Sequence, residues 1–185
     1  MAVDSIAGFS LTRSSADERV SPIAEEVTRL YDELRAPLLR YLFSLRVTPQ
    51  DAEELVQETF LALFHHLRGG KSRANLRGWI FRVAHNTALK QHQRLRRADQ
   101  ANPLSDLADP QPGPEETMAA TQLRQQLLAV VNALPQQDHS CLSLRAEGMR
   151  YREIAGVLGI SLGSVAASLE RSLSRLTRAW RTGGN

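Results

Sequence analysis

The chain has 185 residues, enough for one ordinary domain or two small ones, and its net charge of +3 says little about its partners. Aromatic residues make up only 5% of it, and its apolar residues are mainly Leu, Ala and Val, which favours helical bundles over a β-sandwich or barrel. A single cysteine excludes an intramolecular disulfide framework, and no apolar run approaches the roughly 20 residues that span a bilayer.

The first residues, MAVDSIAGFS, lack the basic start and the sustained apolar core of a signal peptide. We therefore expect the protein to stay in the reducing cytoplasm, without membrane insertion. Residues 1–21 show no sustained periodicity and are predicted to be a flexible tail. Ser21-Pro22 is typical of a helix start. Apolar residues at helical spacing follow as far as Leu45, and Pro37 is expected to kink or split this helix.

The second predicted helix has a clearer start. Thr48-Pro49-Gln50-Asp51 combines an N-cap, a first-turn proline and a carboxylate three residues after the cap. Its apolar face is expected to contain Leu55, Val56, Phe60, Leu63, Phe64 and Leu67, before Gly69-Gly70 ends the helix. Its exposed side is expected to carry an acidic flank, which we define as Asp51, Glu54, Gln57 and Glu58. Carboxylates cannot face phosphates, so this flank predicts a basic protein partner.

A basic stretch follows, from Lys71 to Arg97, with eight Lys and Arg and no Asp or Glu. It begins as a short loop and continues as a third helix whose predicted buried stripe is Leu76, Trp79, Ile80, Val83 and Thr87. A solvated face is the alternative interpretation, but the missing acids favour phosphate contact. Asn75, His85 and Asn86 are predicted to touch bases. The candidate DNA-binding residues here are Lys71, Arg73, Asn75, Arg82, His85, Asn86, Lys90, Arg94 and Arg97.

Residues 98–116 contain four prolines and five acids without periodicity, which predicts an acidic, semi-extended linker. The chain is thus predicted to be all-α, with two small helical domains, at 22–97 and 117–181, joined by a flexible linker.

The second domain ends in a predicted helix-turn-helix. Tyr151 to Leu158 forms a short helix, Gly159 takes the turn, and Ser161 caps a last helix. The core stripe of that helix is predicted to be Val165, Leu169, Leu173, Leu176 and Trp180. A plain helical hairpin is the alternative. The candidate DNA-binding residues on its solvent face are Ser161, Ser164, Ser168, Arg171 and Arg175.

Neither a metal site nor catalysis is predicted. His139 and Cys141 lack the further ligands that a structural zinc site needs, so Cys141 is expected to be a buried helix cysteine. The sequence contains no phosphate-binding loop, no nucleophile motif and no convincing carboxylate pair, and no cofactor is expected.

The segment DAEELVQETFLALF, the basic loop and LRGWIFRVAHNTALKQHQRLRR together resemble region two of bacterial sigma factors of the sigma-70 family, most closely the small extracytoplasmic-function (ECF) group. LLAVVNALPQQDHSCLSLRAEGMRYREIAGVLGISLGSVAASL resembles their region four. The resemblance covers roughly residues 24 to 180. It implies a specificity subunit of RNA polymerase that directs promoter recognition and the initiation of transcription.

The resemblance also implies roles for the surfaces. Glu54, Gln57 and Glu58 would dock on the clamp helices of the largest subunit of core polymerase. The basic stretch would recognise and open the minus-ten element of promoter DNA, and the last helix would read the minus-thirty-five element while touching the polymerase flap. Anti-sigma proteins commonly mask these surfaces in the family, so the resemblance admits such a partner.

The recognition helix departs from the family pattern, because Ala166 and Ser168 stand where basic residues are common and Glu170 adds an acid. Two alternatives come from other classes: a helix-turn-helix regulator that acts at operators without polymerase, and a protein-interaction scaffold whose last helix no longer reads DNA. The acidic flank favours the sigma factor, since a simple repressor has no use for it.

Overall fold

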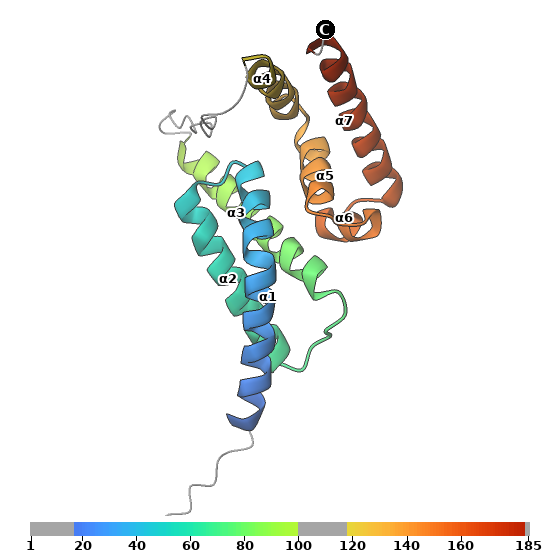
Figure 1. Cartoon of the computed structure of the whole chain (residues 1–185). Coiled ribbons are helices and arrows are strands. Elements are labelled where there is room, and N and C mark those ends of the chain that lie inside the picture. Colours follow the sequence, from blue (N-terminus) through green and yellow to red (C-terminus); the bar gives the residue numbers. More distant parts are fainter. Residues whose placement is uncertain (1–16, 100–117, 184–185) are drawn as a thin grey trace, which may run out of the picture.

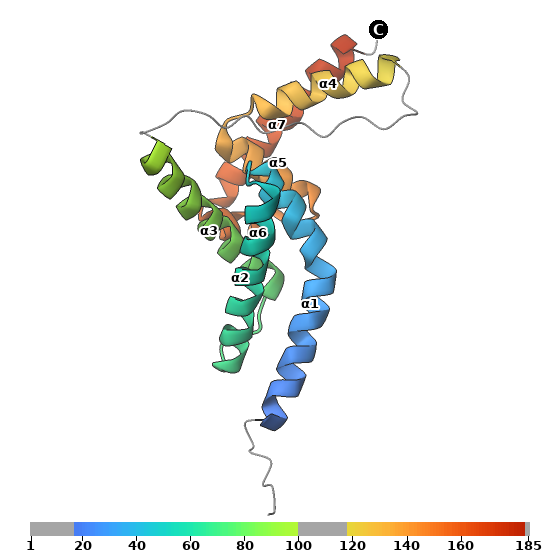
Figure 2. The same cartoon turned by 90° about the vertical axis from the view of Figure 1, so that its left-hand side faces the viewer.

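The computed structural model describes residues 17–99 and 118–183, where the chain is helical and contains no strand, so the predicted all-α class is confirmed (Figure 1). The predicted tail and linker lie largely outside these residues. The helices are α1 (Asp17–Ser44), α2 (Pro49–Arg68), α3 (Leu76–Asp99), α4 (Met118–Asn132), α5 (Gln136–Ala146), α6 (Tyr151–Leu158) and α7 (Leu162–Gly183). Helices α1 to α3 form an N-terminal bundle, and α4 to α7 form a C-terminal domain (Figures 1 and 2).

The predicted start of the first helix at Ser21-Pro22 is wrong, because α1 begins at Asp17 and runs through Pro22. Proline has no amide hydrogen, so the helix loses one internal hydrogen bond there but keeps its course. The helix is also not split at Pro37. The tightly packed residues that follow, among them Leu38, Tyr41 and Leu42, are fully buried and hold this part of α1 in the bundle.

The local signals for α2 are confirmed. The amide of Asp51 donates to Thr48 Oγ1 at 3.2 Å, which satisfies one of the free donors at the start of the helix. The amide of Gly69 caps the other end by donating to the carbonyl of His65. Every residue of the predicted apolar face is buried except Phe64, which is half-buried.

The buried stripe of α3 differs from the prediction. Ile80 is buried as expected, but Leu76, Trp79, Val83 and Thr87 are only half-buried. The buried residues of α3 are instead Gly78, Ile80, Phe81, Ala84, His85 and Ala88. The reason is that α3 packs against two partners, the N-terminal bundle on one side and α6 on the other. A single amphipathic stripe cannot describe a helix with two buried faces.

The C-terminal domain contains the predicted helix-turn-helix. Gly159 adopts a left-handed conformation with a φ of 67°, and the amide of Ile160 returns to the carbonyl of Ala155 at 3.2 Å. The axes of α6 and α7 then meet at 106°, within the range of this motif. No single helix in the described ranges is long and apolar enough to cross a membrane; α6 and α7 pass such a test only when taken together across this bend.

The core stripe predicted for the last helix is correct only in its first half. Val165 and Leu169 are buried, whereas Leu173 and Trp180 are 54% and 57% exposed. Ser168 and Ser172 take the remaining buried positions of α7, opposite α5. The interior of this small domain is therefore partly polar, which matters for the site described below.

The two halves are in contact along a seam formed by α1 and α3 on one side and α5 and α6 on the other. Glu147 lies at its centre with a side chain only 11% exposed. Arg40 of α1 binds both of its carboxylate oxygens, at 2.9 Å from Nε and 2.6 Å from Nη2. Arg77 of α3 donates to the carbonyl of the same residue.

Candidate nucleic-acid and protein interface

Three members of the acidic flank lie exposed on α2, namely Glu54, Gln57 and Glu58. The fourth, Asp51, is half-buried and engaged in the helix cap, where its carboxylate accepts a hydrogen bond from the hydroxyl of Thr48 at 2.7 Å. Asp51 therefore has a structural task that the other three lack. The surface available to a partner is centred on the second and third turns of α2.

Leu61 continues this surface by one helical turn and is 59% exposed. It lies four residues after Gln57, outside the buried stripe of α2. The sequence singled out Leu61 neither for the apolar face nor for the acidic flank, because a lone leucine on an amphipathic helix gives no signal of its exposure. An exposed leucine beside carboxylates gives the flank an apolar contact as well as charge.

The exposed side of α3 carries a basic stripe, which we define as Arg82, Asn86, Lys90 and Arg94. These residues recur at intervals of four, so they lie on one side of the helix. The stripe extends over twelve residues, or about 18 Å at the rise of an α-helix. This length matches several consecutive phosphates of a nucleic acid strand.

The acidic flank and the basic stripe border the same cleft, of about 400 Å³. Asp51, Glu54 and Glu58 line one wall, and Lys90 and Arg94 line the other. Opposite charges on adjoining walls attract different partners, which would approach the bundle side by side.

His85 was predicted to touch bases but lies in the interior, 7% exposed. Its Nδ1 is 2.8 Å from the hydroxyl of Tyr41, which is itself fully buried. Burial lowers the pKa of His85 below its ordinary value and favours the neutral ring. The interpretation of His85 as an accessible DNA contact is wrong, because its face of α3 packs against α1.

The loop before α3 holds three further candidates, all exposed. Asn75 caps α3, since its Oδ1 accepts from the amide of Gly78 at 3.0 Å. Arg73 forms an ion pair with Glu26 of α1 at 3.1 Å. Lys71 lies beside them in the loop. The side chain of Arg97, the last candidate, lies outside the described residues.

Arg77 belongs to the basic stretch but was not singled out by the sequence, and the structure gives it a different task. Its guanidinium reaches the carbonyl of Glu147 across the seam, and its Nη2 is close to Gly148. Gly148 has a φ of 83°, a conformation that other residues rarely adopt. No sequence pattern signals this contact, because the two segments are 70 residues apart.

The five residues predicted for the helix-turn-helix do not share one surface, and Ser164 is half-buried. Ser161 caps α7 by accepting from the amide of Ser164 at 3.1 Å. Arg175 is exposed. Ser168 is fully buried, so its predicted place on the solvent face is wrong. The reason is that α5 packs over this side of α7.

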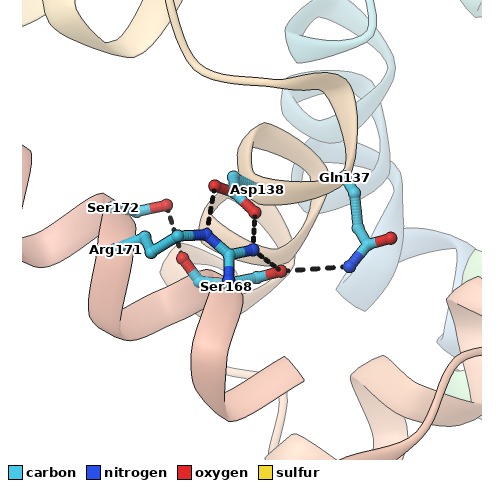
Figure 3. A network of polar contacts seen from close by, with 5 residues as sticks. All are labelled: Gln137, Asp138, Ser168, Arg171 and Ser172. Carbon is cyan, nitrogen blue, oxygen red and sulfur yellow. Dashed lines mark hydrogen bonds and ion pairs between the residues drawn. The ribbon is translucent and has the colours of Figure 1, made fainter. Parts of the chain in front are cut away.

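Arg171 forms the centre of a polar network between α5 and α7 (Figure 3). Its Nε and Nη2 donate to the carboxylate of Asp138 at 3.1 and 2.6 Å, and Nη2 also donates to Ser168 Oγ at 3.1 Å. The side chain of Asp138 is 2% exposed. The hydrogen bond from Arg171 is the main reason that the pKa of Asp138 lies below its ordinary value. The network joins the two helices and holds the guanidinium in place.

Among the described residues, no group of three or more His, Cys, Asp or Glu could hold a metal ion. Cys141 is a free, buried thiol in α5, as predicted, and burial raises its pKa.

Comparison with family models gives two matches. The model of sigma-70 region 2 matches residues 30–98, and the model of sigma-70 region 4 matches residues 124–176. These ranges coincide with the N-terminal bundle and the C-terminal domain. Together they cover well over half of the chain.

Curated relatives agree with these matches. The ECF RNA polymerase sigma factor SigL of Mycobacterium tuberculosis is 31% identical, over 80% of this chain and 84% of SigL. The RNA polymerase sigma factor YlaC of Bacillus subtilis is 28% identical, over 83% of this chain and 91% of YlaC. The ECF sigma factor SigE of Mycolicibacterium smegmatis is 25% identical, over 94% of this chain and 67% of SigE.

Two solved structures share the fold. The sigma factor RpoE of Bartonella quintana, in complex with the anti-sigma factor NepR, has a TM-score of 0.64 at 22% identity and covers 83% of this chain and 97% of its own. CnrH, in complex with the cytosolic domain of CnrY, has a TM-score of 0.61 at 20% identity and covers 90% of this chain and 95% of its own.

Proposed function

Because the chain belongs to the ECF group of the sigma-70 family of RNA polymerase sigma factors, we propose which of its surfaces performs each part of that function. As a sigma factor, it directs promoter recognition and transcription initiation by binding core polymerase and promoter DNA. The proposal assigns core polymerase to α2, the minus-ten element to α3 and the minus-thirty-five element to the helix-turn-helix.

The first assignment is that the acidic flank docks on the clamp helices of the largest polymerase subunit. The exposed Glu54, Gln57 and Glu58 support it, and Leu61 adds apolar area at the end of the same surface. The double substitution Gln57→Ala and Glu58→Ala should weaken holoenzyme formation while α2 stays folded, because both side chains are exposed. A matched control is Asp32→Ala with Glu33→Ala, two exposed acids on α1. Equal affinity for core polymerase in both double variants would exclude the docking assignment.

The second assignment is that the basic stripe binds the minus-ten element. The observation that carries it is the row of exposed Arg82, Asn86, Lys90 and Arg94 on one side of α3. Its cations supply the salt-dependent attraction to phosphates, and Asn86 lies between them within reach of base edges. The exposed loop residues Lys71 and Arg73 extend this surface towards the start of α3.

The third assignment is that α7 enters the major groove at the minus-thirty-five element and that the same domain touches the polymerase flap. The 106° angle between α6 and α7 supports it, since a helix-turn-helix presents its second helix to the groove. The test is footprinting of the holoenzyme on promoter DNA. Protection that stops short of the upstream element would refute the assignment.

The remaining parts of the proposed function are a protein partner and a cellular location. An anti-sigma protein is a candidate partner, because RpoE, which shares the fold, is in complex with the anti-sigma factor NepR, and CnrH is in complex with the cytosolic domain of CnrY. The cytoplasm is the proposed location, since RNA polymerase and promoter DNA lie there. The proposed role is binding and positioning, without a catalytic step.

A further inference from the structure

The exposed face of the recognition helix carries no positive charge along its first nine residues, Leu162 to Glu170. We propose that α7 reads the upstream promoter element through contact of Leu162 and Ala166 with thymine methyl groups and of Glu170 with a cytosine amino group, in place of arginine contacts with guanine. This inference rests on the proposed function, in which α7 enters the major groove of that element.

The burial of α7 decides which of its residues can face DNA. Val165, Ser168 and Leu169 are buried and turn towards the rest of the domain. The opposite side is exposed and holds Leu162, Gly163, Ala166 and Glu170, with Leu162 47% exposed. The N-terminal residues of a recognition helix are the ones that contact base edges in a helix-turn-helix. The DNA-facing surface is therefore apolar with one acid.

The nearest arginine of α7 is not available to this surface. Arg171 binds both carboxylate oxygens of Asp138, and Figure 3 shows its guanidinium directed to α5. If Arg171 turned towards a guanine, Asp138 would be left as a buried and unpaired carboxylate. Residues 161–170 contain no Lys or Arg, so no other cation replaces it in the first half of the helix.

The remaining side chains fit two bases. Leu162, Ala166 and Glu170 follow one another at intervals of four and cover about 12 Å of helix, the length of roughly three to four base pairs. Thymine alone presents a methyl group in the major groove, and the cytosine amino group is the donor that a glutamate accepts from. The guanine edge offers only acceptors, which a carboxylate repels.

Phosphate contacts come from another helix in this arrangement. Arg150 and Arg152 are exposed at the start of α6, the helix that crosses the DNA backbone in this motif. They would fix the register of α7, while the uncharged face of α7 chooses the bases. Ala166 and Glu170 themselves also line a groove of about 750 Å³, together with Tyr151 and Leu173, which makes a protein helix the competing occupant of this face.

The test uses holoenzyme assembled from this chain and bacterial core polymerase, with a library of random-sequence DNA duplexes as the probe. Duplexes that bind are enriched and the upstream element is read from them. Each of its thymines is then replaced by deoxyuridine, which removes only the methyl group. Loss of one contacted methyl should weaken binding about fourfold. Leu162→Ala should remove the effect of deoxyuridine at the thymine that Leu162 contacts. The control variant Leu128→Ala, which changes an exposed leucine of α4, should retain that effect.

The role of Glu170 is tested by a change in the preferred base rather than by a loss of DNA binding. Glu170→Gln should move the preferred base at its position from cytosine to adenine, because glutamine pairs with adenine. The inference would be overturned if the enriched upstream element depended on guanine and if neither deoxyuridine nor either variant changed its binding. The proposed function would remain intact in that case. Enrichment of a downstream element with no upstream preference would overturn the proposed role of α7 as well. Weaker holoenzyme formation by Leu162→Ala, with unchanged DNA preference, would identify a protein-docking face and also overturn the inference.

Discussion

Removing Arg171 should destabilise the C-terminal domain much more than neutralising its partner Asp138. The two members of this ion pair differ in burial, because the side chain of Asp138 is 2% exposed and that of Arg171 is 51% exposed. Arg171→Ala strands a buried carboxylate that keeps Ser168 and the weaker attraction of Arg175 as its neighbours. Asp138→Asn releases an arginine that water can solvate, and it keeps an acceptor in the same place.

The expected cost of Arg171→Ala is about 3 kcal/mol for leaving the buried Asp138 carboxylate unpaired. For a domain of this size, that corresponds to a fall in melting temperature of roughly 12 to 24 °C. Asp138→Asn should cause a clearly smaller fall. Thermal unfolding of the full chain at pH 7, followed by far-UV circular dichroism, measures both.

The dependence on pH provides an independent check. In the native protein the pKa of Asp138 lies below its ordinary value of 3.8, so the pair stabilises fully above that pH and the stabilisation is lost as pH falls further. In Arg171→Ala the pKa of the same carboxyl should rise, since the smaller contributions of Ser168 and Arg175 then remain to oppose the effect of burial. Protonation of Asp138 in acid should therefore reduce the destabilisation of the variant. The difference in stability between the native protein and Arg171→Ala should narrow below about pH 4. This reasoning would be refuted if Arg171→Ala and Asp138→Asn lowered the melting temperature equally. It would also be refuted if the difference in melting temperature between Arg171→Ala and the native protein did not change with pH.

Three other predictions concern the N-terminal bundle and the seam. Replacing Arg82 and Lys90 by Ala should lower promoter opening and reduce the slope of log affinity against log salt by about two; an unchanged slope would mean that these residues are merely solvated. Because the pKa of buried His85 lies below its ordinary value of 6.5, the unfolded chain takes up the proton more readily, and stability should fall as pH drops below about 6.5. In His85→Leu, the free energy of unfolding measured in urea should fall less over the same pH range. An equal fall in the variant and the native protein would mean that other groups cause it. Glu147→Ala should increase the mean distance between fluorescent labels on α2 and α7, and no increase would show that the seam does not depend on this residue.

Features that depend on neighbouring residues in the chain could be predicted from the sequence. The cap of α2 at Thr48, the left-handed turn at Gly159 and the order of the helices all follow from local chemistry. The exposed members of the acidic flank and of the basic stripe also follow, because helical spacing places them on one side of a helix that buries its other side. The family itself was suggested by the resemblance of whole segments, such as DAEELVQETFLALF, to regions two and four of sigma factors.

Features that depend on a distant partner could not be predicted. His85 and Ser168 are polar residues at positions that helical spacing left free, but Tyr41 of α1 packs over the first and α5 over the second. Arg171 looked like a DNA contact until Asp138, 33 residues away, was seen to hold it. In each case the side chain satisfies a buried hydrogen-bonding group, and the sequence does not show which group that will be.

The seam at Glu147 joins two halves of one chain, so its strength depends on the covalent connection between them as well as on its contacts. Its polar contacts are few, although buried apolar residues of both halves belong to one continuous cluster. The two halves are joined through residues 100–117, however, and a short covalent connection gives each half an effective concentration on the order of millimolar around the other. A contact with a dissociation constant of similar size is then formed about half of the time, and small changes in free energy shift that balance in either direction. At such a constant, a modest competitor for Arg40, Arg77 or Glu147, such as a polymerase surface or a stretch of DNA, would be enough to separate the two halves.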